Sequence, residues 1–206
     1  MRRRGRPWAL LPILAATSVA HADTPVELLD RAGATLTLDG LLRDWQGFGP
    51  LRAVDEGSAV HSGAPAWRGA DDAAFAFALA RDDSHLWVAV EVRDDRVQRS
   101  AAHRPTEDAV VLTLAAGPAG GRLTVFEVAL HPGEPGRFAG AVRFRGARSG
   151  DVPGASVVES ATGSGYLLEA RIPWGSLPGL AGASSTLRAR VAYQDSDESP
   201  ARVDTV

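Results

Sequence analysis

The chain has 206 residues, of which 45% are hydrophobic and 23% charged, the balance of a globular protein and not of a disordered chain. It contains no Cys, and all 22 basic residues are Arg, so disulfides, thiolate zinc sites, cysteine nucleophiles and lysine-dependent chemistry are excluded. The formal net charge of -3 argues against a nucleic-acid partner, which needs a basic surface.

The first 22 residues have the pattern of a signal peptide. Four arginines precede a mostly apolar stretch over residues 8–19, and Ala20-His21-Ala22 supplies the small-x-small pattern that a signal peptidase reads. We predict a signal peptide over 1–22, a lead-in over 23–34 and one domain over 35–206, in a periplasmic or secreted protein with no stable membrane insertion after cleavage. The alternative is an N-terminal membrane anchor, although a spanning helix needs about 20 apolar residues.

From Thr35 onward the chain is dominated by alternation of apolar and other residues with a period of two. Because successive side chains of a strand point to opposite faces, each run builds one apolar face that a second layer must cover. The clearest runs cover residues 75–80, 86–93, 126–130, 166–172 and 187–193. Residues 81–84 predict a tight hairpin, and residues 173–177 allow one helical turn. The sequence thus predicts an all-β fold, a single antiparallel β-sandwich of immunoglobulin or jelly-roll type.

Six short fragments occur in a characteristic order along the chain. They read LDGLLRDW (38–45), WRGADD (67–72), DDSHLWVAVEVRDD (82–95), EDAVVL (107–112), LEARIPW (168–174) and VAYQDSD (191–197). This succession resembles the family 9 carbohydrate-binding modules and their DOMON-like relatives. The resemblance implies a β-sandwich, non-catalytic binding of oligo- or polysaccharides, frequent bound calcium, and association with secreted polysaccharide-degrading enzymes.

The resemblance also indicates where a sugar binds, and there the chain departs from the family. Members sandwich a sugar ring between two tryptophans, one just before the fourth fragment and one after the last. Here the first place, residues 103–108, has no aromatic residue, and the second would lie beyond Val206. An aromatic face excludes water from a sugar ring while charged groups bind its hydroxyls. The predicted ligand contacts are Trp67, Trp87, His103, Arg104, Glu107 and Asp71.

Each of these predictions has a structural alternative. Trp87, like Trp45 and Trp174, could pack inside the sandwich, whereas Trp67 lies in a polar stretch and is the tryptophan expected to be exposed. A structural calcium ion is predicted at Asp94, Asp95, Asp195 and Asp197, because calcium takes several oxygen ligands. The alternative is that these aspartates only form turns.

Other chemistry has little support in the sequence. No haem is expected, because the Met and Lys used by haem-binding relatives are absent once Met1 leaves with the signal peptide. The motifs His-Glu-x-x-His and Gly-x-Ser-x-Gly do not occur, so we predict that the protein is not an enzyme. The alternative function is a structural, sensory or protein-interaction sandwich that has lost sugar binding.

Overall fold

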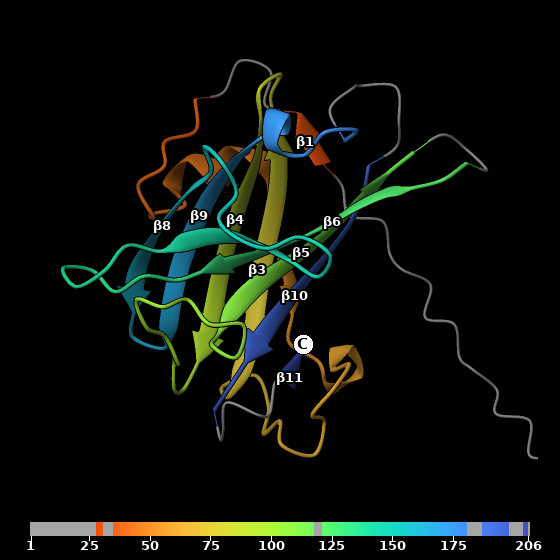
Figure 1. The fold of residues 1–206 in the computed structure, drawn as a ribbon. Helices are drawn as coiled ribbons and strands as arrows, with labels where there is room; N and C mark the ends of the chain where they lie inside the picture. Colours follow the sequence, from red (N-terminus) through yellow and green to blue (C-terminus); the bar gives the residue numbers. More distant parts are fainter. Residues whose placement is uncertain (1–27, 31–34, 118–120, 181–186, 198–203, 206) are drawn as a thin grey trace, which may run out of the picture.

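Two β-sheets packed face to face form the framework of the described chain (Figure 1). The computed structural model describes residues 28–30, 35–117, 121–180, 187–197 and 204–205, so the predicted signal peptide over 1–22 lies outside the described residues. The helical segments within these ranges are short 3-10 turns at Arg43–Phe48, Gly57–Ala59 and Trp174–Ser176. In the same ranges no helix is both long and apolar enough to cross a membrane.

The first sheet has six strands in the order β1-β3-β4-β9-β8, with β2 also paired to β3, and the second has five in the order β11-β10-β5-β6-β7. The first sheet contains β1 (Leu28–Asp30), β2 (Arg52–Val54), β3 (Ala73–Arg81), β4 (His85–Asp94), β8 (Ser156–Thr162) and β9 (Gly165–Pro173). The second contains β5 (Ala109–Ala116), β6 (Thr124–His131), β7 (Ala141–Arg145), β10 (Arg188–Asp195) and β11 (Asp204–Thr205). Among the described strands every pairing is antiparallel except that of β1 with β3. The predicted β-sandwich is therefore confirmed, with one short parallel strand added at its edge.

The main hydrophobic core lies between the two sheets. Alternate residues of β3, β4 and β9 point into it from one side, and alternate residues of β5, β6 and β10 from the other. Leu79, Val88, Leu112, Leu130 and Tyr193 are at most 1% exposed. Burying one large aliphatic side chain contributes roughly 1.5–3 kcal/mol, so this layer is the main source of stability.

A smaller hydrophobic core covers part of the outer face of the six-stranded sheet. Residues 35–51 cross this face and place Trp45 against Ala80, Trp87 and Ala89. The two alanines leave room for the indole of Trp45, which is 2% exposed. Trp87 is buried under the same segment and is 6% exposed, so its packing role is established here.

A buried carboxylate ties this segment to the sheet. Oε2 of Glu169, on β9, accepts hydrogen bonds from the backbone N–H groups of Asp39 at 2.9 Å and Gly40 at 2.6 Å. Its Oε1 accepts from the indole N–H of Trp45 at 2.9 Å. Gly40 has a φ of 75°, and a Cβ there would lie 3.0 Å from the backbone carbon of Glu159. The fragment over residues 38–45 is therefore a structural clamp.

Two local predictions are confirmed. In the β3–β4 hairpin, Oδ1 of Asp82 accepts the backbone N–H groups of Ser84 and His85 at 2.8 and 2.7 Å. The helical turn after β9 is the 3-10 turn Trp174–Ser176, and the indole N–H of Trp174 donates to the Asp82 carbonyl oxygen at 2.9 Å. The sequence does not single out β7 and β8, because their side chains are mostly half-buried and mixed in polarity.

A close backbone approach makes Gly165, the first residue of β9, intolerant of a side chain. Its φ is 145°, and a Cβ there would lie 2.2 Å from the Val92 carbonyl oxygen. We expect Gly165→Ala to lower the free energy of unfolding by about 2 kcal/mol or more, since clash and strain add. Gly163→Ala, two residues earlier, is the matched control, because nothing lies within 4 Å of its added Cβ. Denaturant unfolding measures both, and equal stabilities would contradict this prediction.

Candidate binding face and acidic clusters

The outer face of the five-stranded sheet carries the outward-pointing side chains of β5, β6, β7 and β10. Leu112 and Tyr193 point into the core, so their strand neighbours point outward. Two adjacent rows of directly paired residues cross β10, β5, β6 and β7, and they read Arg190, Thr113, Glu127 and Arg145, then Ala192, Val111, Ala129 and Arg143. At the centre of the face Thr113, Val111 and Glu127 are half-buried, whereas Ala129 and Ala192 are buried. Three arginines of these rows stand on the two flanking strands, Arg190 on β10 and Arg143 and Arg145 on β7.

Arg145 links opposite sides of this face. Its Nε lies 3.5 Å from Oε1 of Glu127, and its Nη1 donates to Oε1 of Gln194 at 2.8 Å. Gln194 is 2% exposed, and its Nε2 donates to the carbonyl oxygens of Pro105 at 2.8 Å and Glu107 at 2.7 Å. Because Gln194 bonds in both directions, it fixes the Arg145 guanidinium and the neighbouring loop relative to the sheet.

That loop, residues 98–108, forms one rim of the face. The Glu107 carboxylate accepts hydrogen bonds from Oγ of Ser100 at 2.5 Å and from the backbone N–H groups of Ser100 and Arg104 at 3.2 and 3.1 Å. His103 has a φ of 46°, a left-handed conformation that is uncommon outside glycine. This loop thus brings together three predicted ligand contacts, His103, Arg104 and Glu107. The carboxylate of Glu107 stabilises the loop through hydrogen bonds to its own residues.

Two histidines meet where the loop reaches the sheet. The ring centroids of His103 and His131 are 5.7 Å apart, and the Phe138 ring lies 5.9 Å from that of His103. Nη1 of Arg143 donates to the His103 carbonyl oxygen at 3.0 Å. Burial, followed by the nearby charge of His103, lowers the pKa of His131 to about 4. His131 is therefore neutral near pH 7.

The buried, neutral His131 makes stability depend on pH. Its pKa is about 4 in the folded protein and near 6.5 when unfolded, so the unfolded state binds more protons between these values. The contribution of His131 is full above pH 6.5 and falls toward pH 4, by up to about 3 kcal/mol. We expect His131→Gln to remove this part of the pH dependence and the exposed-site variant His61→Gln to keep it. Unfolding at pH 7 and pH 5 measures the effect, and an unchanged pH dependence in His131→Gln would refute it.

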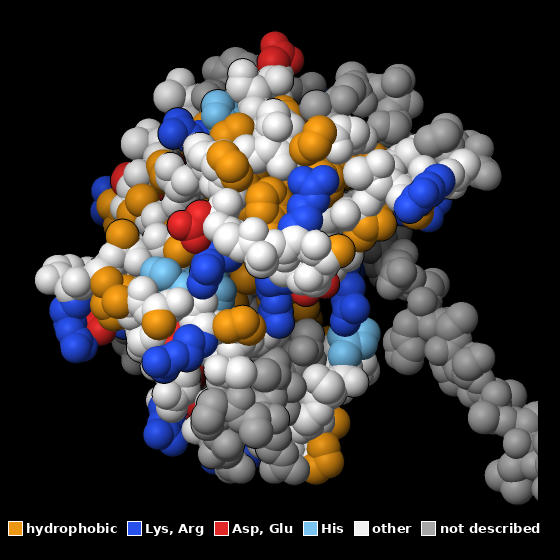
Figure 2. Space-filling view, viewed as in Figure 1, with side chains coloured by type: hydrophobic (Ala, Val, Ile, Leu, Met, Phe, Trp, Pro, Cys, Tyr) orange, Lys and Arg blue, Asp and Glu red, His pale blue; other side chains and the backbone are white. Residues whose placement is uncertain are grey.

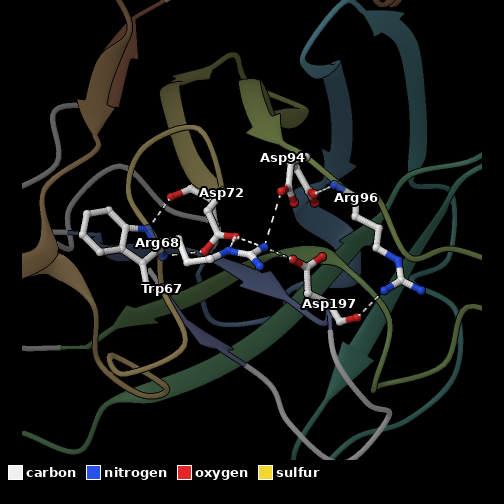
Figure 3. Close-up of polar contacts among 8 residues, drawn as sticks. Trp67, Arg68, Asp72, Asp94, Arg96 and Asp197 are labelled. Carbon is white, nitrogen blue, oxygen red and sulfur yellow. Dashed lines mark hydrogen bonds and ion pairs between the residues drawn. The ribbon is translucent and has the colours of Figure 1, made fainter.

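The other predicted ligand contacts lie elsewhere. Trp87 is on the opposite side of the sandwich, under residues 35–51. Trp67 is half-buried against the main core, and its indole N–H donates to the Ala73 carbonyl oxygen at 2.8 Å (Figure 3). Asp71 is exposed in the turn before β3. The structure thus brings three of the six predicted residues to one place, and ligand binding by any of them stays a prediction.

Four residues of the face are not singled out by the sequence: Arg143, Arg145, Arg190 and Gln194. The alternation of β10 already places Arg190 and Gln194 on the face opposite Tyr193. The sequence does not reveal the order of the strands in the sheet, in which β7 lies three strands away from β10.

The four predicted calcium ligands separate into two clusters. Asp94 and Asp195 join Asp108 in an inner cluster, and Asp95 and Asp197 join Asp72 in an outer cluster. In each cluster one carboxylate oxygen from each aspartate lies within 4.8 Å of the other two. Neighbouring residues of an extended chain point to opposite sides, which explains the split of Asp94 from Asp95. The inner cluster bridges the sandwich, since β4 belongs to one sheet and β5 and β10 to the other.

Arg68 neutralises the outer cluster. Its Nη2 lies 2.5 Å from Oδ1 of Asp72, 3.4 Å from Oδ2 of Asp95 and 3.2 Å from Oδ2 of Asp197 (Figure 3). Burial, followed by the nearby charge of Asp94, raises the pKa of Asp197 to about 6. Because the chain supplies its own cation here, the outer cluster is the poorer place for a metal ion.

In the inner cluster, Asp94 and Asp108 form no ion pair with a described arginine or histidine. The Asp94 carboxylate accepts hydrogen bonds from the Tyr193 hydroxyl and from the Arg96 N–H at 2.6 Å. Oδ2 of Asp108 accepts from the Gln98 N–H, whereas its Oδ1 is buried without a hydrogen-bond partner among the described residues. Burial, followed by the charge of Asp94, raises the pKa of Asp108 to about 9.

These residues fit a hard divalent cation such as calcium. Calcium takes six to eight oxygen ligands, and carboxylates are its commonest side-chain donors. The inner cluster offers carboxylates from three chain segments, including the unpartnered Oδ1 of Asp108. Buried carboxylates at this spacing need either protons or a counter-charge, and a cation could supply the latter.

Solved carbohydrate-binding modules share this sandwich. A family 9 carbohydrate-binding module from Caldicellulosiruptor kristjanssonii in complex with cellotriose matches with a TM-score of 0.57 at 18% identity, over 86% of this chain and 80% of that one. A module of the same family and organism in complex with glucose gives a TM-score of 0.53 at 17% identity, over 83% and 80% of the two chains. A candidate carbohydrate-binding protein from Bacteroides uniformis gives 0.54 at 14% identity, over 86% and 87%.

These matches show that the domain has the family 9 type of fold. The sequence itself matches no protein-family model and no curated protein. The fold expected from the six fragments is therefore confirmed on structural similarity, while the expected ligands and partners depend on the residues of this chain.

Proposed function

We propose that this domain is an exported, non-catalytic carbohydrate-binding module that binds oligo- or polysaccharide on the outer face of its five-stranded sheet and serves a polysaccharide-degrading system. The observation that carries the proposal is the preorganised set of side chains there. The buried Gln194 fixes the Arg145 guanidinium relative to the loop, beside the half-buried side chains of Thr113 and Glu127. A sugar site needs such placed polar groups beside a surface that fits a ring. The fold shared with glucose- and cellotriose-bound modules supports the same function.

The placement of the glutamates supports binding without catalysis. Glycoside hydrolysis needs two carboxyl groups on either side of one sugar bond, roughly 5–10 Å apart. Glu169 is buried beneath residues 35–51, Glu107 is bonded within its own loop, and Glu127 pairs with Arg145. Each of the three thus has a structural partner, and Glu127 lies on the opposite side of the sandwich from Glu169.

We also infer that the inner cluster binds a structural calcium ion through Asp94, Asp108 and Asp195. The ion supplies positive charge to three buried carboxylates and takes no part in chemistry. Asp108 closes the loop over residues 98–108 through its bond to the Gln98 N–H. Because Asp108 would bind the ion and also holds this loop, we expect the bound ion to stabilise the loop at the rim of the proposed binding face.

A glycan array followed by calorimetry on the wild-type chain tests the carbohydrate-binding function. We expect at least one oligosaccharide to bind and Arg145→Ala to weaken it by about tenfold or more, the effect of losing one charge-assisted hydrogen bond. Arg93→Ala removes an exposed arginine from the opposite sheet and should leave the affinity unchanged. If no glycan on the array binds, the proposed function is wrong.

The tryptophans favour a second candidate function, a structural or protein-interaction module. Trp45 and Trp87 are buried in the smaller core. Trp67 and Trp174 are half-buried, and each donates its indole N–H to a backbone carbonyl oxygen. All four are thus engaged in packing, whereas sugar sites commonly use an exposed aromatic face. The absence of binding to any glycan on the array would favour this candidate function.

A further inference from the structure

The outer face of the five-stranded sheet is basic although the chain carries a net charge of -3. The outward positions of β5, β6, β7 and β10 hold four arginines and one glutamate, namely Arg143, Arg145, Arg188, Arg190 and Glu127. The outward positions of β4 and β9, in the opposite sheet, hold two arginines and two glutamates, namely Arg93, Arg171, Glu91 and Glu169. Figure 2 looks onto the five-stranded sheet, and arginine side chains (blue) are spread over this side while acidic ones (red) are few.

The arginines of this face are available to a ligand. Arg190 is exposed and forms no ion pair with a described residue. Nε of Arg143 lies 3.2 Å from Oδ1 of Asp151, whose side chain is 81% exposed. Nε of Arg145 lies 3.5 Å from Oε1 of Glu127, whose side chain is 41% exposed. The side chains of Arg143 and Arg145 are 34% and 26% exposed, and their Nη1 atoms donate to the His103 carbonyl oxygen and to Gln194. Ion pairs with exposed carboxylates contribute only about 0–1 kcal/mol, so an incoming anion can compete with Asp151 and Glu127 for these guanidinium groups.

The spacing of these charges suits an extended ligand. Arg190 and Arg145 occupy the two ends of one row across four strands, so their Cα atoms are roughly 14 Å apart, three strand spacings. Between these two arginines the same row presents the half-buried side chains of Thr113 and Glu127. A short oligosaccharide lying across the strands would meet guanidinium groups along its length.

We propose that this face binds an anionic carbohydrate, with Arg143, Arg145 and Arg190 as the residues that select carboxylate or sulfate groups on the sugar. This inference rests on the proposed carbohydrate-binding function and specifies the chemical class of its ligand. A guanidinium presents N–H donors in a planar fork that matches such oxyanions in two contacts at once. Ion pairing thereby takes the place of stacking on tryptophan, since the described tryptophans are used in packing.

Four probes on the wild-type chain test this inference by calorimetry at low salt: an oligogalacturonate, a sulfated dextran oligosaccharide, neutral cellotriose and single-stranded DNA. We expect at least one acidic sugar to bind at least tenfold more tightly than cellotriose or DNA, and its affinity to fall as salt is added. Arg190→Gln should weaken that binding about tenfold. Arg93→Gln makes the same charge change on the opposite sheet and should have no effect.

The outcomes separate this inference from the function on which it rests. Binding of only the uronate or only the sulfated probe supports the inference and identifies the anion. Cellotriose binding as tightly as the acidic sugars, or unchanged binding in Arg190→Gln, overturns the inference and leaves carbohydrate binding standing. Equal binding of DNA through Arg190 overturns it in favour of a general polyanion surface. If the protein binds none of these sugars and no glycan on the array, both proposals fail.

Discussion

Millimolar calcium is expected to raise the melting temperature of the wild-type protein by several degrees and to leave that of an Asp108→Asn variant unchanged. An ion present at 100 times its dissociation constant stabilises the folded state by about 2.7 kcal/mol. For a protein of this size, that corresponds to roughly 5–10 °C. Asp108→Asn replaces a buried carboxylate whose Oδ1 has no hydrogen-bond partner among the described residues. Thermal unfolding with calcium and with a chelator measures the shift.

Two controls make this experiment decisive. Asp71→Asn makes the same charge change at an exposed aspartate outside both clusters, and it should keep the full calcium shift. In chelator we expect Asp108→Asn to be at least as stable as the wild type, because the amide removes a carboxylate whose pKa burial and Asp94 raise to about 9. A full calcium shift in Asp108→Asn would place the ion elsewhere, and a variant unfolded even in chelator would show that Asp108 holds the fold by itself.

The strands could be predicted from the sequence because every second side chain of a strand is buried, so hydrophobic residues recur with a period of two. The runs around Phe77, Val90 and Leu168 alternate since one face of each strand meets the core and the other does not. Asp82 marks the β3–β4 turn through its own backbone bonds, a local effect that does not depend on the rest of the fold. Such features depend on residues close together in the chain, so the chain order alone reveals them.

The candidate sites could be predicted only in part, because they join segments that are far apart in the chain. Alternation separates Asp94 from Asp95, but only the packing of β4 against β5 and β10 brings Asp94 to Asp108. The role of Gln194 likewise depends on the loop that its Nε2 meets, 87 residues away at the Glu107 carbonyl. The polar surroundings of Trp67 predict an exposed side chain, whereas its bond to the Ala73 carbonyl and its contact with the core leave it half-buried.

Glu169→Ala is expected to cause the largest loss of stability among single acidic substitutions on the outer face of the six-stranded sheet. The carboxylate accepts three hydrogen bonds, from the N–H groups of Asp39 and Gly40 and from the indole of Trp45. Hydrogen bonds to a charged group contribute about 1.5–3 kcal/mol each, and the buried donors would be left unsatisfied. We therefore expect the free energy of unfolding to fall by about 4 kcal/mol or more, measured by denaturant unfolding.

Glu91→Ala is the matched control, since Glu91 is exposed on the same face of the neighbouring strand β4 and should change stability by less than about 0.5 kcal/mol. If Glu169→Ala does not fold, Glu169→Gln, which keeps one carbonyl acceptor, should fold with an intermediate loss. Hydrogen exchange over residues 35–51 then shows whether the loss is local, because releasing the clamp should expose these amides before those of β4. A loss below 1 kcal/mol in Glu169→Ala would mean that the apolar contacts of Trp45 with Trp87 and Ala89 hold the segment without the carboxylate.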